Sequence, residues 1–223
     1  MNLAKGAILT TVAVAFAGTA SAGTWYAEDV PDWRGTDGAD YYLWDDFTAA
    51  NGYVEGPNMP NNEMFPSGNA MLFNFAEGAI IAGSGNLYAM GGSLNIHTYA
   101  YTDADALAVT LNLATIGTLI DYTSMMLVWT DGTEDGESGM LFGSESVNFS
   151  QEIPNMGDSV NVSWNWDLSG IGADIRSIGL MFESEGPHIS LDMASLDILT
   201  AVPAPGALAL LGLAALSSRR RRE

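Results

Sequence analysis

The chain has 223 residues and no cysteine, which excludes disulfide bonds, a thiol nucleophile and a thiolate metal site. Its 27 acidic residues stand against seven lysines and arginines, and the net charge of −20 argues against nucleic acid as a partner. The 48% hydrophobic and 15% charged fractions predict a globular domain with a sizeable core.

Residues 1–22 predict a secretory signal peptide. Lys5 supplies the positive charge, residues 7–17 form an apolar run, and the small residues 20–22 suit a signal peptidase pocket. The run is too short for a permanent membrane-spanning helix. We therefore expect an N-terminal signal helix that signal peptidase removes after Ala22, and export of the remaining chain.

Residues 23–201 predict one β-sandwich domain. Apolar residues alternate with small and polar ones from Leu107 to Leu113, which is the period of a half-buried strand. Short runs of the same character are separated by clusters of Gly, Asn, Asp and Pro. Strands are predicted at 41–47, 70–75, 87–90, 93–101, 107–113, 124–130, 139–142, 159–166, 177–182 and 189–199. Their even spacing favours an all-β sandwich of jelly-roll type.

The segment 131–137 places four carboxylates in a Gly-containing stretch, at Asp131, Glu134, Asp135 and Glu137. Such a loop can wrap oxygen ligands around a hard cation such as Ca²⁺. The Asp-x-Asp-x-Asp-Gly pattern of an EF-hand is missing, so the favoured interpretation is a solvated hairpin loop.

Two flat aromatic side chains, Trp164 and Trp166, lie two residues apart on a predicted strand and share one face. Either they form an exposed platform that contacts a glycan, or they fill the core of the sandwich. Core filling is the favoured interpretation, and it places Ser163 and Asn165 on the outward side.

Little in the sequence supports catalysis, and we predict no enzyme. The two histidines, His97 and His188, are 91 residues apart, and no Gly-x-Ser-x-Gly elbow occurs. We expect each histidine on a strand face or in a turn. A glycoside hydrolase with paired carboxylates remains an alternative, because it needs a cleft geometry that sequence does not show.

The C-terminal segment 202–223 has three parts. It begins with Val202, Pro203, Ala204 and Pro205, continues with an apolar stretch at 206–216, and ends in a basic cluster. The cluster contains Arg219, Arg220, Arg221 and Arg222. The apolar stretch predicts a short helix, and the arginines hold its end in the cytoplasm while the body is outside, so we expect a precursor that is tethered to a membrane.

This tripartite tail resembles the PEP-CTERM sorting signal, which combines a Pro-Glu-Pro motif, a short apolar helix and an arginine cluster. The central Glu of that motif is Ala204 here. The resemblance implies a tether in the inner membrane, an exosortase-like processing enzyme there as a partner, and a location at the cell surface or outside the cell. The alternative is a tail that stays uncleaved as a membrane anchor.

The body resembles the jelly-roll modules of exported PEP-CTERM proteins, which are similar to carbohydrate-binding sandwiches. The residues that carry this resemblance are 44–47, 163–170 and 189–197. It implies a structural Ca²⁺ held by Asp192 on the last strand together with Asp45 or Asp46.

The sequence favours a non-enzymatic surface or matrix protein associated with exopolysaccharide. A carbohydrate-binding module with an aromatic platform is the second hypothesis, and a carboxylate-dependent glycoside hydrolase is the third.

Overall fold

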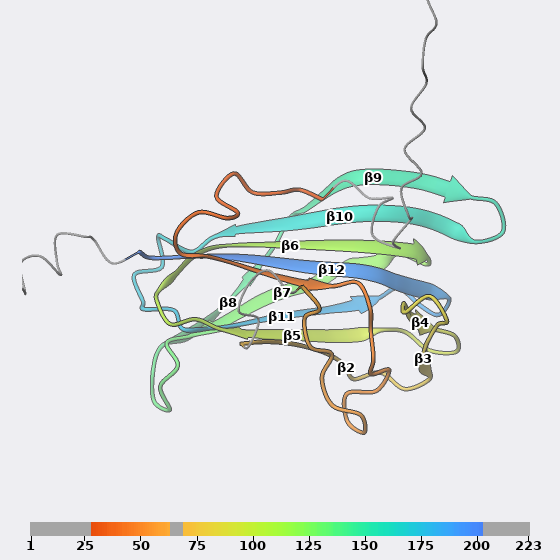
Figure 1. The fold of residues 1–223 in the computed structure, drawn as a ribbon, viewed down its shortest axis with the longest axis horizontal. Coiled ribbons are helices and arrows are strands. Elements are labelled where there is room, and N and C mark those ends of the chain that lie inside the picture. Colours follow the sequence, from red (N-terminus) through yellow and green to blue (C-terminus); the bar gives the residue numbers. More distant parts are fainter. Residues whose placement is uncertain (1–27, 63–68, 203–223) are drawn as a thin grey trace, which may run out of the picture.

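The structure, a computed structural model, describes residues 28–62 and 69–202, which form twelve β-strands and no helix. Figure 1 shows the strands running along the long axis of the molecule. In chain order they are β1 (Ala39–Trp44), β2 (Ala70–Asn74), β3 (Ala79–Ile81), β4 (Leu87–Ala89), β5 (Asn95–Tyr101), β6 (Ala106–Gly117), β7 (Ile120–Thr130), β8 (Ser138–Phe142), β9 (Glu145–Ile153), β10 (Gly157–Asp167), β11 (Ser177–Ser184) and β12 (Ile189–Thr200).

The strands form two sheets. The seven-stranded sheet has the order β3-β4-β12-β6-β10-β9, with β1 also paired to β12, and the five-stranded sheet has the order β2-β5-β11-β7-β8. All of the strand pairs are antiparallel. In Figure 1, β6, β10 and β12 run side by side in one sheet and β5 and β11 in the other. This arrangement is that of a β-sandwich, so the predicted all-β class is confirmed.

The hydrophobic core lies between the two sheets. Leu111 of β6 and Leu196 of β12 point into it from the seven-stranded sheet, and Leu72 of β2 and Phe182 of β11 from the five-stranded sheet. Each of these side chains is almost fully buried, and burial of such a side chain is worth about 1.5–3 kcal/mol. Successive side chains of a strand point to opposite faces, so the alternation fixes which residues remain on the outer faces.

The ten predicted strands all occur, and the structure adds β3 and β9. Strand β3 has three residues, too few to show a period. Strand β9 lies at the edge of its sheet and is largely exposed, and the alternation of its apolar residues Val147, Phe149 and Ile153 is interrupted by Gln151. The predictions missed both strands because a strand is recognised in sequence by the alternation of its buried apolar side chains. These two strands are held mainly by backbone hydrogen bonds.

The predicted signal peptide, residues 1–22, lies outside the described residues, as does the predicted sorting segment after Val202. Val202 itself is half exposed and follows β12 directly. Residues 28–62 and 69–202 contain no helix with the length and apolar character needed to cross a membrane.

Candidate functional site

The outward side of the five-stranded sheet is apolar across all five strands. The strand register places its side chains in two parallel rows. One row contains Phe73, His97, Met181, Met126 and Phe142, and the other contains Met71, Tyr99, Gly179, Val128 and Met140. We call these two rows the apolar face. Antiparallel sheets with a solvated side alternate apolar and polar residues, so an apolar outer side marks an interaction surface.

Five aromatic rings gather at the β2 and β5 end of this face and form the aromatic cluster. The rings of Phe73 and Phe75 are nearly parallel, with centroids 5.4 Å apart. Tyr53 lies 4.8 Å from Phe75, and His97 meets Phe75 edge-on at 4.9 Å. Tyr99 meets Phe73 edge-on at 6.0 Å. These separations are those of favourable aromatic pairs, so the rings form one continuous surface.

The loop before β2 positions the outermost ring of the cluster. The N–H of Gly52 donates to Asn74 O at 2.7 Å, and a Cβ at Gly52 would lie 3.1 Å from the side chain of Phe73, so the loop lies flat against β2. The Glu55 carboxylate accepts two backbone N–H groups at the start of the loop, at 2.5 and 3.2 Å. Tyr53 is held on this ordered turn and is 75% exposed.

The cluster is uncharged at neutral pH but has polar atoms at its margin. Burial lowers the pKa of His97, against the attraction of Glu183, so the imidazole is neutral. Its Nδ1 lies 3.0 Å from the hydroxyl of Tyr99, whose pKa is raised by burial. Asn95 donates to Glu183 at 3.3 Å at the same edge. Flat apolar rings bordered by amide, hydroxyl and imidazole groups suit a ligand with an apolar face and hydroxyl edges.

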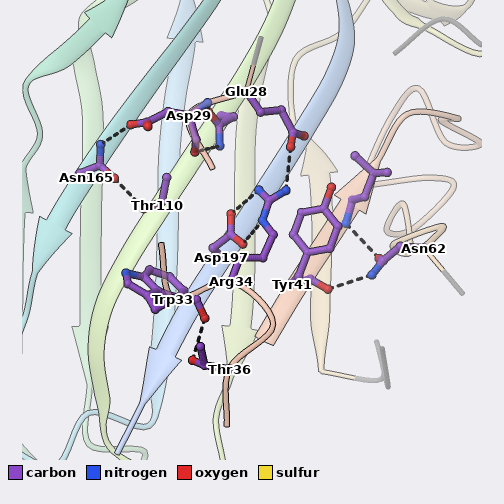
Figure 2. Close-up of polar contacts among 12 residues, drawn as sticks. Glu28, Asp29, Trp33, Arg34, Thr36, Tyr41, Asn62, Thr110, Asn165 and Asp197 are labelled. Atoms are coloured by element: carbon purple, nitrogen blue, oxygen red, sulfur yellow. Dashed lines mark hydrogen bonds and ion pairs between the residues drawn. The ribbon is translucent and has the colours of Figure 1, made fainter. Parts of the chain in front are cut away.

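The outward side of the seven-stranded sheet differs from the apolar face in two respects. Its side chains are polar, and they are buried. Buried polar residues of β6, β10 and β12 include Thr110, Asn112, Asn161, Ser163, Ser195 and Asp197. We call them the covered polar face. Figure 2 shows residues of the segment 28–36 lying across these strands.

An arginine fastens this segment to the sheet. Arg34 donates to both carboxylate oxygens of Asp197, at 2.6 and 2.7 Å, and to Glu28 at 2.7 Å (Figure 2). Its guanidinium lies 4.0 Å from the ring centroid of Tyr41. Asp197 is fully buried, and burial raises its pKa to about 6 although the bonds from Arg34 lower it. A bidentate pair of this kind is the form in which a buried carboxylate is tolerated.

Asp29 satisfies further groups of the covered polar face. Its N–H donates to Asn112 Oδ1 at 2.8 Å, and Asn112 Nδ2 donates back to Asp29 O at 3.2 Å. Asn165 Nδ2 donates to the Asp29 carboxylate at 3.0 Å, and Asn165 Oδ1 accepts from Thr110 Oγ1 at 2.6 Å (Figure 2). The segment 28–36 therefore acts as a polar cover for this sheet and supplies partners for Asn112, Asn165 and Asp197, whereas Asn161 Nδ2 and Ser195 Oγ are buried without a partner among the described residues.

The acidic loop is the hairpin between β7 and β8, as the favoured interpretation predicted. Asp131 accepts the N–H and hydroxyl of Thr133, both at 2.9 Å, and the N–H of Glu137 at 3.0 Å. These bonds lower the pKa of Asp131. Glu134 and Asp135 are exposed. The Asp131 carboxylate closes the turn and already has hydrogen-bond donors on both oxygens.

Strand pairing brings the other predicted calcium ligands to one end of the sandwich. Asp45 and Asp46 follow β1, which pairs with β12, the strand that contains Asp192. Their contacts nevertheless diverge: Asp45 accepts the side-chain amide of Asn61, and Asp192 accepts that of Asn86 at 2.5 Å.

Neither predicted calcium site is assembled by these contacts. No group of three or more histidine or acidic side chains in 28–62 and 69–202 is placed to hold a metal ion. At the Asp192 end, Asn86 Oδ1 is buried without a hydrogen-bond partner. This atom and Asp192 supply fewer oxygens than the about six to eight that Ca²⁺ takes. Calcium at either place stays a prediction that the described geometry does not support.

The tryptophan pair fills the core. Trp164 is 0% exposed and Trp166 is 6% exposed, and a Cβ at Gly143 would lie 2.7 Å from both rings. The pair therefore presents no platform to a glycan, and the favoured interpretation of core filling is confirmed. The histidines also lie as expected: His97 is on the face of β5, and His188 is in the turn before β12 with φ of 65°.

Comparisons of the chain with known protein families and with curated proteins found no match. The aromatic cluster was not predicted from sequence. Strand β2 reads as the continuous apolar run 71–73, which is typical of a strand buried on both sides. This continuous apolar run, which follows a polar loop and forms an edge strand, is the sequence signal that could have indicated an apolar outer side.

Proposed function

We propose that this chain is an exported, non-enzymatic surface or matrix protein, with a body of jelly-roll type that contacts exopolysaccharide through the aromatic cluster. The observation that carries the proposal is the continuous, partly exposed surface of Tyr53, Phe73, Phe75, His97 and Tyr99, in which Tyr53 is the most exposed ring. Aromatic faces attract the C–H groups of sugar rings, and the polar margin can meet their hydroxyls.

The charge of the body favours a neutral glycan. Of the 27 acidic residues only Glu223 lies outside 23–202, and that span contains two arginines. A body of this charge repels uronic acids and sulfated sugars at low ionic strength. The rows of the apolar face hold no ionised side chain at neutral pH, so a neutral chain can approach them without displacing an ion pair.

Affinity electrophoresis through gels that contain a neutral or an anionic polysaccharide tests this proposal. We expect retardation by galactomannan, xyloglucan or the neutral exopolysaccharide of the host, and none by alginate. Tyr53→Ala removes the most exposed ring and should weaken binding about tenfold, equivalent to 1.4 kcal/mol. The matched control is Phe142→Ala, which removes a 71% exposed ring at the far edge of the same sheet. Equal weakening by both variants, or no retardation by any neutral glycan, would refute the proposal.

A glycoside hydrolase is the second candidate, favoured by a cavity of about 280 Å³ that Asp40 and Asp103 line together with Tyr101. Burial and the nearby Asp103 raise the pKa of Asp40, and a carboxyl group with a raised pKa is the general acid of many glycosidases. Release of reducing ends from the same polysaccharides, lost in Asp40→Asn but not in Asp174→Asn, would establish this candidate. We expect no release.

Export and sorting belong to the same proposal. They rest on the sequence pattern of residues 1–22 and 202–223. Intact-mass spectrometry of the protein from the native host should find a chain that begins at Gly23 and lacks Arg219, Arg220, Arg221 and Arg222. An arginine tail that persists in the membrane fraction would instead identify a tail anchor.

A further inference from the structure

Strand β8 ends the five-stranded sheet with an unguarded edge. It pairs with β7 on one side, and no strand of residues 28–62 and 69–202 pairs with its other side. Its sequence, Ser-Gly-Met-Leu-Phe, contains no charge and no proline. Met140 is 60% exposed and Phe142 is 71% exposed on its outward side. An edge of this kind presents unpaired N–H and C=O groups and is a template for another strand.

The other edges of the sandwich are guarded. Strand β9 carries the exposed charges of Glu145 and Glu152, and β3 has three residues. Strand β2 exchanges backbone hydrogen bonds with Asn58, at 2.7 and 3.0 Å. The free side of β1 is bonded to the side chain of Asn62, at 2.9 and 3.0 Å (Figure 2). Charge, shortness and covering loops are the usual protections of sheet edges, and β8 has neither a charged residue nor, among residues 28–62 and 69–202, a segment bonded to its free side.

We propose that two copies of this chain associate by antiparallel pairing of β8 with β8 of the second copy. The pairing satisfies both unguarded edges with one symmetric contact, which is the commonest form of homo-oligomer. Centred on Met140, it sets Met140 opposite its equivalent and Phe142 opposite Ser138. The two five-stranded sheets then form one continuous ten-stranded sheet. Methionine side chains adapt their shape readily, so the apolar face continues across the junction.

The charge around β8 selects this orientation. The acidic loop with Asp131, Glu134, Asp135 and Glu137 comes directly before β8. Antiparallel pairing puts the two acidic loops at opposite ends of the paired strands, about 17 Å apart at ~3.4 Å per residue. This separation exceeds the Debye length of about 8 Å at physiological ionic strength. A parallel pairing would place the two loops side by side.

The contact is small and joins two acidic bodies, so the dimer should be weak and should strengthen with salt. Interfaces of standard size reach micromolar affinity or better, and this one, centred on a five-residue strand, falls below that size. Screening of the mutual repulsion between copies of net charge −20 should raise the dimer fraction as ionic strength increases. Association driven by attraction between opposite charges would show the reverse dependence.

Sedimentation velocity of the exported chain, from about 2 to 200 μM in 20 and 500 mM NaCl, tests the proposal. We expect a monomer–dimer equilibrium that shifts toward dimer at the higher salt. Met140→Lys places like charges opposite each other and should abolish the dimer. The matched control is Met156→Lys, because Met156 is 59% exposed but lies in the β9–β10 hairpin. A mixture of Met140→Lys and Met140→Glu chains should restore dimerisation through the opposite charges.

Hydrogen exchange of the unsubstituted chain tests the proposal even if the Met140 variants do not fold. In the unsubstituted chain, amide protection should rise with protein concentration within 138–142 and stay constant within 145–153. A monomer at every concentration and salt, equal effects of Met140→Lys and Met156→Lys, or concentration-independent exchange in β8 would overturn the proposal. Tyr53→Ala should leave the dimer unchanged, so failure of this inference and failure of glycan binding are distinguishable.

Discussion

The outer sides of the two sheets differ in both polarity and exposure. The seven-stranded sheet has polar side chains there and buries them beneath residues 28–36, whereas the five-stranded sheet has apolar side chains there and leaves them partly exposed. Polarity of a side chain therefore does not predict exposure in this molecule. What decides exposure is whether another segment of the chain is available to supply partners.

The two surfaces also differ in their contribution: the covered polar face stabilises the fold, and the apolar face is available for association. On the covered polar face, Asp197 and Asn112 have partners from Arg34 and Asp29, which belong to the same chain. On the apolar face, Met140 and Phe142 contribute little to the core and remain available. We expect substitutions on the first surface to change folding and substitutions on the second to change association.

Loss of the Arg34 ion pair should have the largest effect. Arg34→Met leaves the Asp197 carboxylate buried without a cationic partner, which costs about 3–5 kcal/mol of unfolding free energy. The body offers one matched control, Arg176→Met, whose ion pair with Asp174 is partly exposed and should contribute far less. Urea denaturation followed by tryptophan fluorescence measures both. Equal losses would mean that the segment 28–36 is not fastened by this pair.

The loss of stability caused by Arg34→Met should also depend on pH. The pKa of Asp197 in the folded chain, about 6, lies above its ordinary value of 3.8, so the folded state holds this proton more tightly. The stability contributed by that proton is fully present below about pH 3.8 and is lost as the pH rises through about 6. Arg34→Met should raise this pKa further and lose more stability at pH 7.5 than at pH 5. A thermal midpoint difference that is constant across this range would contradict the assignment.

Two valines compare the inner and outer sides of the strands directly. Val162 is fully buried on β10, and Val128 is half-buried on the apolar face. Val162→Thr buries a hydroxyl in the core and should cost about 1–3 kcal/mol. Val128→Thr should change stability by less than about 0.5 kcal/mol, as surface substitutions do. A loss above 1 kcal/mol for Val128→Thr would show that this face is covered in the folded chain.

The smallest expected effect is at the acidic loop. Hydrogen bonds from Thr133 and Glu137 lower the pKa of Asp131, so its carboxyl should titrate below its ordinary value in carbon-detected NMR. Thr133→Val removes one hydroxyl donor and should move that pKa back toward the ordinary value. Global stability at pH 7 should change little, because the loop is exposed. An unchanged pKa in the variant would show that the turn is not closed by these bonds.

Sequence predicts the inward half of this protein better than the outward half. The alternation around Leu111 and the spacing of Trp164 and Trp166 report directly on burial, so ten strands and the core role of the tryptophans were predictable. The pair of Arg34 with Asp197 spans 163 residues and depends on how the chain crosses the sheet. The aromatic cluster likewise depends on the pairing of β2 with β5, which no local pattern encodes.

Strand β12 has a consequence for the order in which the chain folds. It is the last strand, yet it pairs with β1, β4 and β6, and Ala39 finds its partner in Leu199. A chain that emerges from a ribosome or a translocation pore with its N-terminus first must hold β1 without a partner until almost the whole body has appeared. Pairings so distant in sequence fold slowly, because their loop-closure entropy is lost before their contacts form. The seven-stranded sheet is therefore completed late, only after the entire domain has emerged.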